Sequence, residues 1–308
     1  MERNCQKAVI GLERGSMTKQ PDVSIIVLTY NTKDLTLQCL SSLEKTVWGT
    51  VTREIIVVDN ASSDQTLASV KKQFPSVTIF RSPTNIGFAA GNNVGIKRAK
   101  GRYILLLNSD TECEKDSIPS MVGFMDSHPS AGAATCKLVL PDGSIDPACH
   151  RGFPTPWNAC SYYAKFEYLF PHTKLFGGYH QGYKDMSIPH EVDAISGAFF
   201  MVRSETLADV GGLDESFFMY AEDIDWAYRI KKSGWQIWFV PSVTVLHLKK
   251  QSGRAHTSKD VRRKSREYFL ENNKRFYTKH YEKKYPSVVT FFVYLWYDIQ
   301  LFMNATFH

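Results

Sequence analysis

Four short apolar runs alternate with helical patterns in the first third of the chain, and this alternation restricts the fold more than any other feature. The apolar runs are Val23–Leu28, Glu54–Val58, Val77–Phe80 and Tyr103–Leu107. They are rich in β-branched residues, which is typical of strands covered on both faces. Helical patterns lie between them, at 34–43, 65–74 and 92–99. The order predicts an α/β fold with a Rossmann-like, mostly parallel sheet flanked by helices.

Polar residues follow three of these predicted strands. They are Thr29-Tyr30-Asn31, Asp59-Asn60 and Asn108-Ser109-Asp110. In open α/β sheets, ligands bind at the carboxyl ends of the strands. Any one of the three could be a simple turn, but together they predict one nucleotide site. For Asp64, which follows the second group, we favour a helix cap instead.

The segment Asn85–Asn93 contains glycines at the start of a predicted helix. Free amides there attract phosphate, and glycine lets a ligand approach the backbone closely. The alternative is that Gly87, Gly91 and Gly95 lie on one helix face packed against the sheet.

Two further groups of residues could bind a cation or act as a base. Asp110 offers a hard oxygen ligand, and His247 ends an apolar run, where it is either a core residue or a metal or diphosphate contact. Glu222, Asp223 and Asp225 crowd the start of a helix predicted at 222–233. One of these carboxylates could take the proton of an acceptor hydroxyl, or all could complement the helix N-terminus. For Asp225 we favour pairing with Arg229 at helical spacing.

The second half of the chain has less regular patterns. Strands are predicted at 132–140, 194–203 and 235–240, with an Asp142-Gly143 turn. The stretch 152–190 is rich in Pro, Gly, Tyr and Phe without a clear period, and we expect a long loop near an acceptor site.

The cysteine content and the lack of long apolar runs indicate in which cellular compartment the protein is expected. Six cysteines are scattered without CxxC pairs, which favours reduced thiols in a cytoplasmic protein. Residues 1–20 are polar and predict a loose tail without a signal sequence. No run reaches the roughly 20 apolar residues of a membrane span, and the nearest, Val288–Tyr297, ends before Asp298.

The C-terminal appendage, 253–308, combines a Lys- and Arg-rich stretch with an aromatic and aliphatic one. A basic helix followed by an apolar helix predicts peripheral docking on an anionic membrane surface. The alternative is that the apolar helix packs on the domain. Nucleic-acid binding is the least favoured interpretation, and the sequence leaves the oligomeric state open.

Five segments together resemble family 2 glycosyltransferases. They are 24–31, 56–62, 85–88, 107–110 and 220–223, and the similarity extends over 22–252. The chain is most similar to rhamnosyltransferase-type members, through Asn85-Ile86-Gly87-Phe88, the Pro141–Ser144 turn and the run from Gly212 to Phe218 before Glu222-Asp223. The resemblance implies a GT-A domain at 21–252.

The resemblance also implies roles for particular residues. Asp223 would be the catalytic base of an inverting transfer, with Glu222 beside it near the acceptor. Asp110 and His247 would hold Mg²⁺ or Mn²⁺. The nucleotide-sugar site would comprise Thr29, Tyr30, Asn31, Asp59, Asn85, Gly87, Gly91, Asn92, Asn108 and Ser109. Asn108 replaces an aspartate common in the family, which leaves Asp110 as the only carboxylate of that motif.

The predicted function is therefore transfer of a hexose from dTDP-rhamnose or a UDP-sugar to a glycan or lipid-linked acceptor, in the synthesis of cell-surface polysaccharide. The enzyme would lie in the cytoplasm or peripherally on the cytoplasmic face of the membrane. Two other functions remain open at this point. A nucleotidyltransferase would need a Gly-rich basic loop after the first strand, which Leu28–Asn31 does not provide. A non-catalytic nucleotide-sugar-binding protein would not need Asp223.

Overall fold

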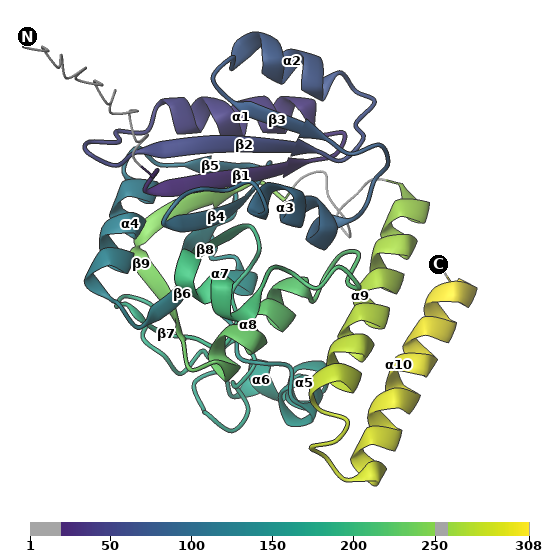
Figure 1. The fold of residues 1–308 in the computed structure, drawn as a ribbon. Helices are drawn as coiled ribbons and strands as arrows, with labels where there is room; N and C mark the ends of the chain where they lie inside the picture. Colours follow the sequence, from purple (N-terminus) through teal and green to yellow (C-terminus); the bar gives the residue numbers. More distant parts are fainter. Residues whose placement is uncertain (1–19, 250–257, 308) are drawn as a thin grey trace, which may run out of the picture.

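A computed structural model describes residues 20–249 and 258–307. One mixed sheet forms its centre, in the order β3-β2-β1-β4-β8-β6-β9-β5, with β7 paired to β9 (Figure 1). The strands are β1 Val23–Thr29, β2 Arg53–Asp59, β3 Thr78–Arg81, β4 Tyr103–Asn108, β5 Thr111–Cys113, β6 Ala131–Val139, β7 His190–Glu191, β8 Phe199–Arg203 and β9 Gln236–His247. Residues 1–19 of the predicted tail, including Cys5, lie outside the described residues.

Helices cover both faces of the sheet. They are α1 Lys33–Glu44, α2 Thr66–Gln73, α3 Phe88–Ile96, α4 Ser117–Ser127, α5 Pro156–Tyr163, α6 Phe166–Leu169, α7 Ser204–Val210, α8 Glu222–Lys232, α9 Lys259–His280 and α10 Ser287–Phe307, with a 3₁₀ turn at Pro147–Cys149. Side chains of β1 alternate between the faces. Leu28 faces α3, whereas the Thr29 hydroxyl bonds that of Thr36 in α1 (2.8 Å).

The parallel half of the sheet is the predicted one. β3, β2, β1 and β4 are neighbours and run parallel, and their apolar residues form the core. β8 then runs antiparallel between β4 and β6, while β6 and β9 are parallel to each other. The sequence therefore predicted the directions of the first four strands. The other half of the sheet contains both parallel and antiparallel pairs, and these form between segments that are far apart in the sequence.

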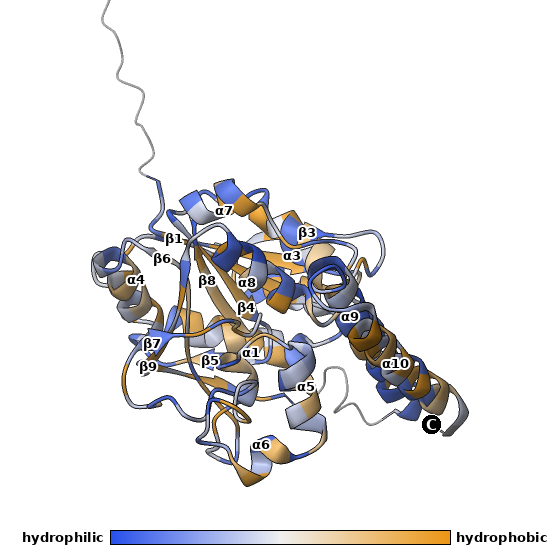
Figure 2. Cartoon of the chain, turned by 90° about the horizontal axis from the view of Figure 1, so that it is seen from below, coloured by the Kyte–Doolittle hydropathy of each residue, from blue (hydrophilic) through white to orange (hydrophobic). Residues whose placement is uncertain are grey.

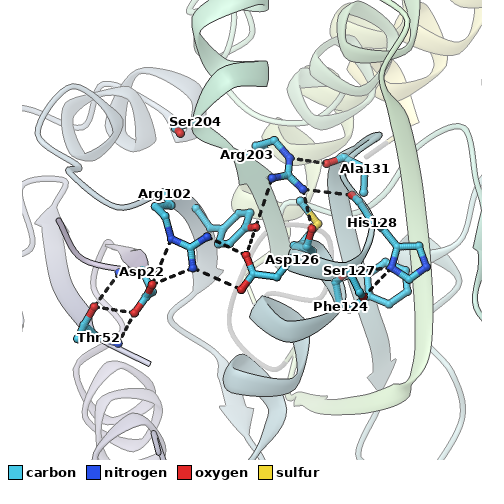
Figure 3. Close-up of polar contacts among 12 residues, drawn as sticks. Asp22, Thr52, Arg102, Phe124, Asp126, Ser127, His128, Ala131, Arg203 and Ser204 are labelled. Atoms are coloured by element: carbon cyan, nitrogen blue, oxygen red, sulfur yellow. Dashed lines mark hydrogen bonds and ion pairs between the residues drawn. The ribbon is translucent and has the colours of Figure 1, made fainter. Parts of the chain in front are cut away.

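An ion-pair network joins the sheet to α4 at the amino end of β1 and β4 (Figure 3). Arg102 bridges Asp22 (2.8 Å) and Asp126 (2.7 Å). Arg203 donates to the carbonyls of Met125 (2.6 Å), His128 and Ala131. This network lies at the opposite end of the strands from the polar residues discussed below.

Several sequence expectations are wrong in detail. The stretch 152–190 contains α5 and α6, so it is not one long loop. Thr155 caps α5 by accepting from Asn158, with Pro156 in the first turn, a start signal that the aromatic composition obscured. The strand predicted from residue 194 begins only at Phe199, and α3 begins at Phe88 instead of Asn92.

The C-terminal segment forms a hairpin of two helices, α9 and α10, that pack on each other. The expectation that the apolar run is too short for a membrane span is wrong. Helix α10 continues past Asp298, whose charge is paired with Lys274 of α9. By length and composition alone, 287–306 could cross a membrane, and 6% of that window is buried.

Candidate functional site

The carboxyl ends of β1, β2 and β4 lie at one edge of the sheet. Thr29 is in register with Asp59, and Leu28 is in register with Asn108. Because adjacent strands are about 4.8 Å apart, the polar groups that follow these strands lie side by side. The structure thus brings together the three segments that the sequence assigned to one site.

Thr29 and Asn31 are engaged with their neighbours at this edge. The buried hydroxyl of Thr29 lies 3.0 Å from that of Thr32, so it holds the start of α1. Asn31 has a positive φ of 53°, and its side-chain oxygen accepts from the amide of Ser63 (2.7 Å). Tyr30 is 47% exposed and presents its ring at the edge.

Asp59 and Asn60 connect β2 to the segment around Asn85. The fully buried Asp59 carboxylate accepts from the Ser62 amide (3.2 Å) and lies 3.4 Å from Nε of Arg81. Asn60 donates to Oδ1 of Asn85 (2.9 Å) and to the Gly87 carbonyl (3.1 Å). Asn60 thus positions the 85–87 segment. The sequence indicated this residue because its polar side chain directly follows a predicted strand.

The glycine segment serves packing at two of its positions. A Cβ on Gly91 would lie 2.6 Å from Leu28, and one on Gly95 would lie 2.5 Å from Ile26. These glycines therefore let α3 approach β1 closely, as the alternative interpretation proposed. Gly87 differs, because its φ of 88° suits only glycine and a Cβ there would lie 2.5 Å from the Phe218 carbonyl.

Asn92 and Ser109 also bond within the protein. Asn92 is buried in the first turns of α3 and donates to the Phe88 carbonyl (3.0 Å). The Ser109 hydroxyl lies 3.1 Å from that of Thr32. The Asn108 amide donates to the Ala198 carbonyl (3.0 Å), which joins the end of β4 to the turn before β8.

Asp110 and His247 meet because β5 pairs with β9. Thr111 is in register with His247, and Nε2 of His247 lies 3.4 Å from Oδ1 of Asp110. The other carboxylate oxygen of Asp110, Oδ2, is buried and has no hydrogen-bond partner among the described residues. A buried carboxylate oxygen without a partner is costly, so a cation that binds there would relieve the cost.

Asp146 stands behind His247, and the sequence analysis missed it. Its Oδ2 lies 2.8 Å from Nδ1 of His247, and its Oδ1 accepts from Lys249 (2.7 Å). Burial alone would lower the pKa of His247, but the hydrogen bonds to Asp110 and Asp146 raise it to about 9. A carboxylate on the second ring nitrogen is the usual support of a metal-binding histidine, since it fixes the ring and its tautomer.

Asp110 and His247 fit a divalent cation whose remaining coordination positions are filled by a bound ligand. In 20–249 and 258–307, no three His, Cys, Asp or Glu side chains are grouped closely enough to hold a metal alone. Asp110 and His247 would supply two ligands. Oxygen atoms of a diphosphate and water would complete the six that Mg²⁺ or Mn²⁺ prefers.

Asp223 lies at the first turn of α8 and is paired with Arg151. Its Oδ2 lies 2.7 Å from Nη2 of Arg151 and 3.4 Å from the Gly197 amide. Gly197 precedes Ala198, which bonds Asn108, so Asp223 lies beside the end of β4. Two consecutive residues with positive φ, Tyr220 (73°) and Ala221 (67°), turn the chain into α8. Such strained backbone concentrates at functional sites.

Glu222 is buried next to Asp223. Burial first, and then the charge of Asp223, raise the pKa of Glu222 well above its usual range. Its Oε2 has no hydrogen-bond partner in the described part of the chain. Because burial and the neighbouring charge favour the protonated form, this carboxyl group could donate a hydrogen bond to a ligand.

Arg151 is a site residue that the sequence analysis did not identify. Burial alone would lower its pKa, but the charges of Asp223 and Tyr179 raise it. Arg151 reaches Asp223 through a bridge between its own backbone and Ala194, 43 residues further along the chain. No local pattern indicates such a pairing. The interpretation of Asp225 is confirmed, since it pairs with Arg229 (2.9 Å).

Comparisons with known proteins indicate one family. The model of the family described as Glycosyl transferase family 2 matches residues 24–191. The chain is 28% identical over 209 residues to N-acetylglucosaminyl-diphospho-decaprenol L-rhamnosyltransferase of Mycobacterium tuberculosis, with 64% of this chain and 67% of the relative covered. It is 25% identical over 190 residues to rhamnosyltransferase WbbL of Escherichia coli, with 57% and 66% covered.

A solved structure shows the same fold. The mannosyltransferase of Pyrobaculum calidifontis in complex with GDP-Man and Mn²⁺ superposes with a TM-score of 0.60 at 18% identity, over 94% of this chain and 74% of that one. The fold is that of GT-A glycosyltransferases. The chain spans about two thirds of the length of the two rhamnosyltransferases.

Proposed function

This chain belongs to glycosyl transferase family 2, and from that premise we propose that it moves a hexose from a nucleotide diphosphate-sugar to an acceptor hydroxyl with inversion at the anomeric carbon. The observation that carries the proposal is the pair of acidic centres at one edge of the sheet. Asp110 keeps a buried oxygen that has no hydrogen-bond partner within 20–249 and 258–307, and Asp223 lies beside the end of the same strand. The centre at Asp110 suits the leaving diphosphate, and the centre at Asp223 suits the acceptor hydroxyl.

The donor would lie across the ends of β1, β2 and β4. Tyr30, the loop around Asp59 and the 85–87 segment surround the nucleoside, while Asn108 and Ser109 face the diphosphate. Asp110 and His247 would hold the cation, and the hydrogen bond to Asp146 would keep the ring of His247 in its orientation. The cation, when bound, neutralises the charge that develops on the departing diphosphate.

Asp223 acts as the base in this proposal. It takes the proton of the acceptor hydroxyl while that oxygen attacks the anomeric carbon, and the diphosphate departs from the opposite face. Arg151 holds the carboxylate in place through a 2.7 Å ion pair. Glu222, buried beside Asp223, would contact the acceptor.

The relatives guide the choice of substrates. Two of them are named for rhamnose transfer, and one name includes a decaprenol-linked acceptor. We therefore propose dTDP-rhamnose as donor, with UDP-sugars as the second choice. A lipid-linked glycan at the cytoplasmic face of the membrane would be the acceptor, in the assembly of cell-surface polysaccharide.

A thermal-shift screen of nucleotide sugars with and without Mn²⁺ tests the donor. A ligand at 100 times its dissociation constant stabilises a protein by about 2.7 kcal/mol, which is readily seen as a rise in melting temperature. No stabilisation by dTDP- or UDP-sugars, with or without the metal, would contradict the proposal.

The Asp223→Asn variant tests the base. Loss of a general base lowers turnover by about 10²–10⁴-fold, so transfer should fall in that range while donor binding persists. Asp185→Asn removes an exposed acid within 152–190 and serves as the matched control. Transfer by Asp223→Asn at the parent rate would refute the assignment. Donor binding without any transfer by the parent protein would favour a non-catalytic binding protein.

A further inference from the structure

Exposed apolar side chains gather on two segments of the surface. Among the described residues, all the large apolar side chains classed as exposed lie in 157–175 or in α10, apart from Tyr30, Val47, Ile188 and Val261. Large contiguous apolar patches on a protein surface mark sites of interaction with a partner or a membrane. Neither segment belongs to the site described above.

Helix α10 presents an apolar face to solvent and contacts α9 through a mixed face of polar, aromatic and aliphatic side chains. Val288, Phe291, Leu295, Ile299 and Phe302 are exposed and recur at the spacing of one helix face. Figure 2 shows orange, hydrophobic stretches along α10 and blue, hydrophilic stretches on the neighbouring α9.

The opposite face of α10 is bonded to α9. The hydroxyl of Thr290 lies 2.9 Å from that of Tyr277, and Asn304 donates to the Arg263 carbonyl (3.1 Å). Asp298, the single charged residue of α10, is paired with Lys274. The outward face therefore carries no unpaired acid.

The 157–175 segment adjoins α10 and has the same character. The rings of Tyr163 and Trp296 lie 4.5 Å apart, which joins α5 to α10. Tyr168 of α6 is 84% exposed. The single acid of this segment, Glu167, is buried and accepts from the His180 amide (2.7 Å). Its cations, Lys165 and Lys174, are exposed.

We propose that α10 and the 157–175 segment form one surface that binds an anionic phospholipid bilayer, with α10 lying in the plane of the interface. Charge complementarity selects this partner. Arg263, Lys264 and Arg275 of α9 and Lys283 of the turn before α10 are exposed, and basic side chains near an apolar helix face bind anionic headgroups. Helix α10 does not span, because its opposite face is bonded to a charged helix that hydrocarbon would not accept.

The surface lies close to the proposed base. Asp223 pairs with Arg151, and Tyr179 is a neighbour of the Arg151 side chain. The ring of Tyr179 is 5.4 Å from that of Tyr162, which is exposed within the 157–175 segment. An acceptor anchored in lipid would thus approach Asp223 from the membrane side. The approach of an acceptor to Asp223 rests on the proposed function, whereas the binding of lipid does not.

Flotation with vesicles tests the proposal on the full chain. Vesicles of phosphatidylglycerol and phosphatidylcholine are compared with vesicles of phosphatidylcholine alone, at low and high salt. Two double variants remove apolar contacts, Phe291→Glu with Phe302→Glu in α10 and Tyr168→Glu with Leu169→Glu in α6. Val47→Glu changes an apolar residue that is 65% exposed outside both segments and is the matched control. Melting temperature and donor-induced stabilisation, measured without vesicles, report folding and the donor site separately.

The proposal expects the parent and Val47→Glu to float with anionic vesicles, less so at high salt. Each double variant should bind at least about tenfold more weakly, with donor-induced stabilisation unchanged. Absence of binding by the parent would overturn the proposal, as would loss of binding in one double variant only. A parent dimer that the α10 variant converts to monomer without a change in flotation would show that a second copy covers this face, and would also overturn it.

Discussion

Replacing Asp146 by Asn tests how the protein supports His247. The buried carboxylate of Asp146 lies 2.8 Å from Nδ1 of His247 and accepts from Lys249 and from the Ala148 amide. Burial alone would raise the pKa of Asp146, but the hydrogen bonds from His247 and Lys249 lower it. The substitution removes that charge and places an amide group among three donors.

The structure sets the size of the effect. Lys249 is 43% exposed and can turn toward water, so its lost ion pair costs little. His247 is buried, and a hydrogen bond to a charged group contributes about 1.5–3 kcal/mol. The free energy of unfolding should fall by about that amount, which a domain stable by about 5–15 kcal/mol survives. Loss of a carboxylate behind a metal-binding histidine weakens metal affinity by about 10–100-fold.

Two measurements on the same variant separate these effects. Urea unfolding gives the change in stability, and titration with Mn²⁺ in the presence of a nucleoside diphosphate gives the metal affinity. Asp142→Asn, four residues away in an exposed turn, should leave metal affinity unchanged. If Asp146→Asn lowered stability but bound Mn²⁺ as tightly as the parent, His247 would not be a ligand and the reasoning would be refuted.

Three further perturbations have defined outcomes. Gly87→Ala forces a Cβ against the Phe218 carbonyl at a φ that only glycine adopts, so the free energy of unfolding should fall by about 1–3 kcal/mol. The control is Gly123→Ala, at an exposed position of α4 with open space around it. This substitution should raise the free energy of unfolding by up to about 1 kcal/mol. Arg203→Lys loses donors to three carbonyls and should lower the melting temperature while donor binding persists, and an unchanged melting temperature would contradict the network in Figure 3. Burial alone would raise the pKa of Asp22, but the hydrogen bonds from Thr52 and Arg102 outweigh burial and lower this pKa to about 2. The ionised Asp22 therefore contributes fully to the stability of the fold above the unfolded pKa of about 4. That contribution disappears as the pH falls toward 2. Acid unfolding should therefore be less steep in Arg102→Gln, and identical curves would show that this ion pair does not matter.

The parallel half of the fold could be predicted because its signals are local. Apolar β-branched runs with helical patterns between them specify β1, β2, β3 and β4 and their parallel directions, whereas the order of the strands was not predicted. The second half depends on pairings between distant segments. β8 joins β4 to β6 across nearly a hundred residues, and nothing in Phe199–Arg203 itself indicates an antiparallel partner.

The candidate site divides in the same way. Asp59, Asp110 and Asp223 stand next to recognisable strand ends or a helix start, so their positions could be predicted. Arg151 and Asp146 could not, since each lies in an irregular stretch and reaches the site only through tertiary pairing. Gly91 shows the converse, since a motif that suggested phosphate binding packs against Leu28.

The central claim is that Asp110 and His247 hold a cation that binds the donor's diphosphate beside Asp223. Crystals of the protein grown with Mn²⁺ and a nucleoside diphosphate give the most direct measurement, through the anomalous scattering of manganese. The account predicts one peak within about 2.5 Å of Oδ2 of Asp110 and of Nε2 of His247, bridged to the diphosphate. A manganese ion bound elsewhere, or a diphosphate bound away from the ends of β1, β2 and β4, would contradict it.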